Sequence, residues 1–208
     1  MTQERVLAGA LELADRIGVA DLTIRRLAEA LDSKPMTIYH HVPSKDAILD
    51  GIVDLVFAEI ELPDPELELK AAMRARCVSA REVLARHPWA VPLMESRRSP
   101  GPATLRHHDA VVACLRRGLS LPMTAHAYAV LDAFVYGFAI QEAALPNPGD
   151  DMAEVVDGLV DEQFAEHFPA IHAFTVDHAQ QPGYDFGDEF DLGLDLILDG
   201  LDARAAEG

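Results

Sequence analysis

The chain has 208 residues, half of them hydrophobic, which is enough for one ordinary domain or two small ones around a sizeable core. Its 17 Lys and Arg residues against 35 Asp and Glu residues give a formal net charge of −18, which argues against a protein coated in positive charge that binds nucleic acid anywhere. The acids are unevenly placed: residues 1–50 hold six basic and eight acidic residues, residues 51–141 hold ten of each, and residues 142–208 hold one basic and seventeen acidic residues. The N-terminal third is nearly neutral, so a small binding face there is compatible with the total.

The other global signals favour a cytoplasmic protein that needs no membrane, metal or cofactor. No uninterrupted apolar run approaches the roughly 20 residues of a membrane helix, because Asp132 breaks the best one at residues 127–140. The polar N-terminus is unlike a secretory signal. The two cysteines, Cys77 and Cys114, have no Cys-x-x-Cys spacing and predict two reduced thiols in a helical core.

Helical periodicity dominates the first sixty residues, and no alternating strand pattern is present. Gly18 is placed to end the first helix, Thr23 to cap the second, and Pro35 to begin the third. The pattern predicts helices over residues 2–17, 24–31, 35–41 and 44–60.

Proline-rich breaks divide the rest of the chain into further helices. These are predicted over residues 64–87, 88–96, 102–119, 124–145, 151–168 and 188–206, with a loop at 180–183. The fold class is therefore all-α, with about nine or ten helices.

The second and third predicted helices are short and are joined by a tight turn at Asp32-Ser33, which is the layout of a helix-turn-helix. In such a motif the second helix enters the major groove of DNA. The inner side is supplied by apolar residues, namely Leu27, Ala28, Leu31, Ile38 and Val42.

The segment from Thr23 to Lys45, with the run PMTIYHHV at 35–42 followed by Ser44-Lys45 and Leu49, resembles the DNA-binding domain of the TetR (tetracycline repressor) family. The resemblance implies an N-terminal three-helix DNA-binding domain at residues 1–46, with the helix-turn-helix at about 22–41. It also implies a larger helical domain for effector binding and dimerisation at residues 47–208. The function implied is that of a dimeric repressor, released from its double-stranded operator by a small, largely apolar ligand.

The resemblance also assigns DNA contacts to positions around the turn. The start of the second helix supplies Thr23 and Arg25. The recognition helix supplies three family-variable positions, Lys34, Pro35 and Met36, and three positions that contact bases or phosphates, Thr37, Tyr39 and His41. The next helix supplies a phosphate-binding lysine, Lys45. A helix N-terminus with a lysine is a good phosphate site. Tyr39 also fits helix packing, and His40 and His41 also fit a helix end. Arg26 fits either a DNA contact or a solvated charge. Because the helix-turn-helix of one subunit has so few cations, it should bind DNA weakly by itself. Two subunits on adjacent half-sites are therefore expected.

In the larger region, homodimer contacts are expected from the last long helices, at 124–145 and 188–206, although ordinary packing within the chain explains the same apolar pattern. Aspartates at 188, 191, 195, 199 and 202 run opposite the apolar stripe of the last helix, and a solvated face that also repels DNA is expected there. A ligand pocket is expected among the central helices. Its candidate residues are Trp89, Met94, His107, His108, Tyr128, Asp132, Phe134, Phe138 and Gln141.

Two alternatives remain open from the residues alone. A helical enzyme using scattered histidines and carboxylates is one, but no nucleophile-elbow, dinucleotide-binding, Walker or zinc-protease motif is present. The adjacent His107 and His108 diverge by about 100° on a helix, which disfavours a metal site. A DNA-independent interaction module using the acidic C-terminal region is the other.

Overall fold

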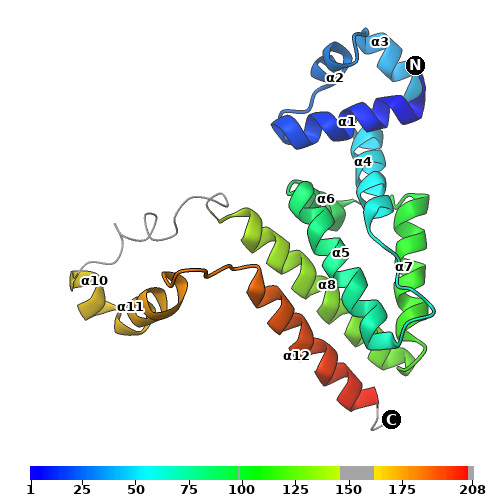
Figure 1. Ribbon diagram of the computed structural model, residues 1–208. Coiled ribbons are helices and arrows are strands. Elements are labelled where there is room, and N and C mark those ends of the chain that lie inside the picture. Colours follow the sequence, from blue (N-terminus) through cyan, green and yellow to red (C-terminus); the bar gives the residue numbers. More distant parts are fainter. Residues whose placement is uncertain (98, 146–161, 206–208) are drawn as a thin grey trace.

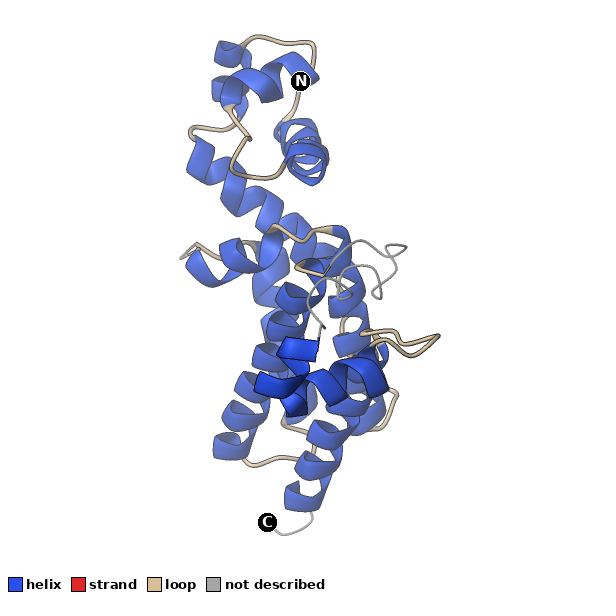
Figure 2. Ribbon diagram, turned by 90° about the vertical axis from the view of Figure 1, so that its left-hand side faces the viewer, coloured by secondary structure: helices blue, strands red, loops and turns tan. Residues whose placement is uncertain are grey.

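The computed structural model describes residues 1–97, 99–145 and 162–205, and all regular structure in these ranges is helical (Figure 1). The view turned by 90° shows an elongated molecule with the N-terminal helices at one end and the C-terminus at the other (Figure 2). The expected all-α class is confirmed.

The N-terminal helices begin and end where the sequence provides caps. They are α1 (Gln3–Ile17), α2 (Ile24–Ala30), α3 (Pro35–His41) and α4 (Lys45–Glu59). The side chains of Thr2, Thr23 and Ser44 each accept a backbone N–H three residues further on. Gly18 ends α1 with a φ of 76°, a conformation that costs glycine little.

These four helices surround one buried cluster, which we call the head cluster. It includes Val6, Ala10, Leu13, Leu22, Leu27, Ala28, Ile38, Val42, Ile48 and Ile52. The last two residues belong to the first half of α4, so that helix is part of the head.

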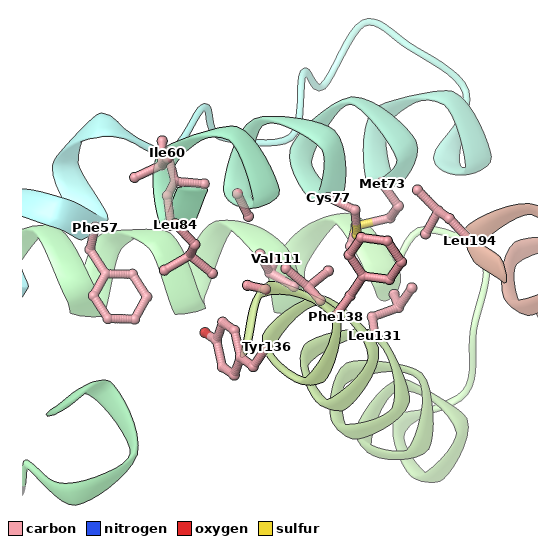
Figure 3. Close-up of a cluster of buried hydrophobic side chains, with 14 of the residues drawn as sticks. Phe57, Ile60, Met73, Cys77, Leu84, Val111, Leu131, Tyr136, Phe138 and Leu194 are labelled. Carbon is pink, nitrogen blue, oxygen red and sulfur yellow. The ribbon is translucent and has the colours of Figure 1, made fainter. Parts of the chain in front are cut away.

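The second half of α4 joins a separate cluster, the body cluster, through Val53, Val56 and Phe57. The other helices of the body are α5 (Leu69–Arg86), α6 (Ala90–Ser96), α7 (Pro102–Leu115), α8 (Leu121–Ala143) and α12 (Asp188–Ala205). Figure 3 shows side chains from α4, α5, α7, α8 and α12 meeting in this cluster. Because α4 contributes to both clusters without a break, a domain boundary at residue 46 stays a prediction.

Helix α8 is the one described helix whose length and composition would let it cross a membrane. It lies instead against α5, α7 and α12, and Leu131 and Val135 are fully covered by them. Asp132 on the same helix pairs with a buried arginine of α5, which fits a central helix of a protein core.

Some boundaries differ from those predicted. Helix α5 starts at Leu69 and not at residue 64, because the carboxylate of Asp64 accepts the backbone N–H of Glu66 in a turn. The helix predicted over 151–168 lies mostly outside the described residues; its last turn is α10 (Glu162–His167). Helices α11 (Pro169–Phe174) and η1 (Thr175–Ala179), which the periodicity did not predict, extend with α10 away from the body (Figure 1).

The aspartates of α12 are not simply a solvated face. The guanidinium of Arg74 on α5 binds the carboxylates of Asp191 at 2.8 Å and Asp195 at 2.5 Å. Lys70, one turn earlier on α5, pairs with Asp199. The stripe is largely exposed, as expected, and three of its five acids also help to dock α12 on α5.

Close packing of α12 on α8 leads to a prediction for two glycines of the same helix. A Cβ at Gly193 would lie 2.7 Å from the ring of Phe134, whereas a Cβ at Gly200 would meet nothing within 4 Å. We expect Gly193→Ala to lower the free energy of unfolding by about 1–3 kcal/mol through overpacking. Gly200→Ala, the matched control, should leave it unchanged or raise it by up to about 1 kcal/mol. Chemical unfolding at one protein concentration measures both; equal effects would contradict the proposed close approach.

Candidate nucleic-acid interface and ligand cavity

Helix α3 lies on the head with its two faces sharply divided. Ile38 and, at the C-cap, Val42 are fully buried in the head cluster. Met36 is 67% exposed and Tyr39 is 45% exposed, and Pro35 and His40 are exposed as well. Thr37 and His41 are half-buried at the edge. Tyr39 is therefore partly packed and partly exposed, and the outer face of α3 is open to solvent.

Two helix N-termini flank this outer face. Ser44 caps α4, and Lys45 follows it as an exposed residue of the first turn. Thr23 caps α2 by accepting the N–H of Arg26 at 3.2 Å, which leaves its hydroxyl hydrogen available to an outside acceptor. Unpaired N–H groups at such helix starts attract phosphates.

The cations of the head are only partly available. Arg25 pairs with Glu29 at 3.1 Å, one turn further along α2. Arg26 is bound to both the carboxylate and the carbonyl of Asp21, at 2.8 and 3.1 Å, and its side chain stays about half exposed. Lys34 and Lys45 have no ion-pair partner in the part of the chain that the structure describes. A single head therefore offers few charges to a phosphate backbone.

A cavity of about 320 Å³ opens between α4, α6, α7 and α8. Its lining includes four of the nine residues predicted for a pocket: Met94, His108, Tyr128 and Asp132. It also includes residues that the sequence analysis did not nominate, namely Asp50, Val53, Phe57, Glu95, Arg97, Ser99, Pro100, Gly101, Thr104 and Tyr136.

The other five predicted residues lie elsewhere. The indole of Trp89 donates to Asp15 at 2.7 Å at the junction of head and body. Phe134 and Phe138 pack against Phe190 and Phe186, on the side of α8 that faces α12. His107 is buried behind the cavity, and Gln141 is exposed.

A simple spacing separates the two sides of α8. Positions 128, 132 and 136 are four apart and share the cavity face, whereas positions 134 and 138 are displaced from them by half a turn. Tyr136 could have been found from this spacing once Tyr128 and Asp132 were chosen. Phe57 and Arg97 could not, because they come from helix α4 and from the C-cap of α6.

A buried polar network lies behind the cavity wall. The fully buried guanidinium of Arg76 donates to Asp132 at 2.8 Å and to Nε2 of His107 at 3.1 Å. Burial disfavours the charge on Arg76, but the carboxylate of Asp132 more than offsets this, so the pKa of Arg76 is raised. The pair holds α5 and α8 together at the inner end of the cavity.

The network fixes the state of His107. Arginine can only donate, so Nε2 of His107 accepts and the proton of the neutral ring is on Nδ1. That Nδ1 is buried and has no hydrogen-bond partner among the described residues. Burial, together with the charge of Arg76 and the neighbouring His108, lowers the pKa of His107 to about 3.

His108 faces the cavity and its Nδ1 is hydrogen-bonded to the hydroxyl of Tyr128. Burial lowers the pKa of His108 as well, so both histidines are neutral at pH 7. Each ring already has a protein partner, and no group of three metal-ligating side chains is present among the described residues.

The cavity is connected to the start of α4 by Arg97. Its Nε donates to Asp50 at 2.5 Å, and its other nitrogens donate to the carboxylate and carbonyl of Asp46 at 3.2 and 3.1 Å. Asp46 is next to Lys45, so one cavity residue reaches the first turn of α4. A second link runs from Asp54 on α4 to the N-terminus of α7, where its carboxylate accepts the N–H and hydroxyl of Thr104 at 2.8 and 2.9 Å.

The neutral state of His107 predicts a pH dependence of stability. An unfolded histidine titrates near pH 6.5, so between about pH 6.5 and 3 the unfolded chain binds a proton that the folded chain does not. This contribution to stability is present above pH 6.5 and is lost as the pH falls through that window. In His107→Gln the amide oxygen can still accept from Arg76 but takes no proton. As the pH falls, the free energy of unfolding of this variant should therefore decrease less steeply than that of the unaltered protein. The two slopes should differ by up to about 1.4 kcal/mol per pH unit.

Urea unfolding at pH 7 and pH 5 measures this slope. His126→Gln, at an exposed position of α8, is the control and should keep the slope of the unaltered protein. A slope in His107→Gln that equals the control would contradict the buried neutral state.

Known families and structures match along the whole molecule. A family model for bacterial regulatory proteins of the tetR family matches residues 6–52, and one for the C-terminal domain of tetracyclin repressor-like proteins matches residues 62–205. An HTH-type transcriptional regulator of Saccharopolyspora erythraea is 31% identical, with 99% of this chain and 86% of the relative covered. The HTH-type transcriptional repressor DrrR1 of Streptomyces coeruleorubidus is also 31% identical, with coverages of 100% and 79%.

A solved structure agrees over the same extent. ActR of Streptomyces coelicolor, a TetR family protein in complex with actinorhodin, matches with a TM-score of 0.79 and 28% identity, covering 99% of this chain and 98% of that one. These relatives are regulators, and they lend no support to an enzyme. The chain therefore belongs to the tetR family of bacterial regulatory proteins and is a helix-turn-helix transcriptional regulator.

Proposed function

We propose that the chain is a dimeric repressor that leaves its operator when a small, largely apolar ligand enters the cavity between α4, α6, α7 and α8. The observation that carries this proposal is the link from the cavity through Arg97 to the first turn of α4, beside the exposed face of α3. Two relatives support it: DrrR1 is named a transcriptional repressor, and ActR binds actinorhodin. The protein would act in the cytoplasm, on DNA and not as an enzyme.

The proposed DNA contacts divide by chemistry. The exposed Lys34, Pro35, Met36 and Tyr39 would meet base edges or the backbone, with Thr37 and His41 at the edge of the same face. Thr23 and Arg25 on α2, and Lys45 on α4, would bind phosphates on either side.

The proposed homodimer uses outward faces of α8 and α12. The predicted stripe of α12 is divided: Phe190, Leu194 and Leu198 are buried within the chain, whereas Leu192 and Leu196 remain 60% and 68% exposed. On α8, Val130 and Ile140 are exposed on one face. Exposed apolar side chains on two neighbouring helices favour a second copy as their cover.

Release would follow from a shift between two populated states. In one state the two recognition helices are spaced for adjacent half-sites, and in the other they are not. A ligand lowers operator affinity only by as much as it binds the second state more tightly than the first. Arg97 is positioned to transmit that preference, because it lines the cavity and holds two carboxylates of α4.

The DNA interface is tested with Lys45→Gln. Without the lysine charge, each subunit binds one phosphate fewer, so operator binding should weaken and the slope of log affinity against log salt should fall by about 1 per phosphate. The measurement is fluorescence anisotropy with a duplex from upstream of the protein's own gene, titrated with salt. Arg117→Gln, just beyond the C-terminus of α7, is the control and should keep the full slope. An unchanged slope in Lys45→Gln argues against the phosphate contact.

The link to the cavity is tested with Arg97→Gln. Loss of Arg97, which holds the first turn of α4, should lower operator affinity about fivefold or more. The salt slope should stay unchanged, because Arg97 is not at the DNA interface. Arg86→Gln removes another arginine that pairs with α4, through Glu59 at 2.8 Å on the surface, and should change affinity little. Equal affinities for the two variants would contradict the role of Arg97.

A further inference from the structure

The cavity has a wall of aromatic rings that fits a flat apolar body. The rings of Phe57 and His108 lie 5.2 Å apart, and those of His108 and Tyr128 lie 5.9 Å apart. Tyr136 adds a fourth ring from the same face of α8. A volume of about 320 Å³ accommodates a ligand of two or three fused rings.

The charges of the wall are mostly negative. Among the described lining residues, three carboxylates, from Asp50, Glu95 and Asp132, face one guanidinium, that of Arg97. That guanidinium already donates to Asp46 and Asp50, and Asp132 is paired from behind with Arg76.

Glu95 is different from the other two carboxylates. It is exposed on α6 and has no hydrogen bond or ion pair among the described residues. Burial raises the pKa of both Tyr128 and Tyr136, and the charges of Asp132 and Glu95 add to this effect, so Glu95 acts on the same space as the two hydroxyls. An unneutralised carboxylate thus stands at the edge of an aromatic wall.

Tyr136 supplies a second, independent sign of a ligand. It is 8% exposed and lines the cavity, yet its hydroxyl has no hydrogen-bond partner in the described ranges. Figure 3 shows this hydroxyl on the side of Phe57, away from Phe138 and Cys77. A hydroxyl that lines the cavity without a protein partner is available to bond to a group that enters it.

These features discriminate between classes of ligand. An anion would be repelled by three carboxylates, and to bind the guanidinium of Arg97 it would first have to break the bonds of that group to Asp46 and Asp50. A neutral ligand would gain nothing from the charge of Glu95. A cation is attracted both by the carboxylate and by the faces of aromatic rings.

We propose, on the basis of the proposed function, that the effector is a cationic aromatic amine, with its flat body against Phe57, His108 and Tyr128 and its ammonium group between Glu95 and the hydroxyl of Tyr136. The ammonium donates to both oxygens. Glu95 is then the residue that selects for charge.

Three probes of one shape test the charge: naphthylethylamine, naphthylethanol and naphthylacetic acid, each titrated into the full-length protein by calorimetry. The amine should bind about tenfold more tightly than the alcohol, and the acid most weakly. Glu95→Gln should remove most of this preference by weakening the amine alone. Glu82→Gln, at an exposed position of α5 outside the cavity, is the matched control and should keep the preference.

The inference is overturned if the alcohol or the acid binds as tightly as the amine, if no amine binding is detected, or if Glu95→Gln keeps the preference. Anisotropy with the operator duplex tests the proposed function separately. An amine that binds in the cavity but leaves DNA affinity unchanged would contradict ligand-induced release and still support the ligand class. A preference for another probe that does release DNA would support release and overturn the ligand class.

Discussion

Helix α4 is buried in two hydrophobic clusters at once, and the rest of the molecule is arranged around that constraint. Ile48 and Ile52 pack in the head, and Val56 and Phe57 pack in the body one to two turns later. A helix is stiff over fifteen residues, so a displacement of its body half is carried to the head. Phe57 also lines the cavity, which places the ligand site directly on this helix.

Polar contacts reinforce the same helix along its length. Arg97 holds its first turns, Asp54 binds the start of α7, and Glu59 near its end is hydrogen-bonded to His87. The other nitrogen of that imidazole lies 2.7 Å from Asp15 of α1. Because one histidine bridges carboxylates of α1 and α4, head and body are connected at both ends of the shared helix. The buried pair of Arg76 and Asp132 keeps the opposite wall of the cavity rigid, since removing one partner of such a pair costs about 3–5 kcal/mol.

The head could be predicted from the sequence because its signals are local. Caps at Thr23 and Ser44, the turn at Asp32, and the buried Ile38 and Val42 are all within a few residues of the helices that they define. The cavity depends on contacts distant in sequence. Helix α8 is apolar on most sides, so periodicity alone could not tell the cavity face from the face toward α12.

Asp132 is the exception on α8, because a lone carboxylate in an apolar helix must have a partner and therefore marks a polar site. The partner itself, Arg76 on α5, could not be identified without the packing of the two helices. The same reason hid the pairing of Arg74 with the aspartates of α12, where a pattern that indicated a solvated face turned out to be part of a helix contact.

The distribution of charge bears on how a ligand could act on such a head. Residues 1–50 hold fewer basic than acidic residues, and Arg25 and Arg26 are each paired with a neighbouring acid, so a single head has no excess positive charge with which to bind DNA. In the proposed dimer, affinity then depends on two heads contacting adjacent half-sites together, and not on a strong field from either one. If one head no longer lies in line with its half-site, all of its contacts with DNA are lost. A highly basic head would still bind DNA non-specifically. A weakly charged head is therefore more easily released by a small movement of α4 than a strongly charged one would be.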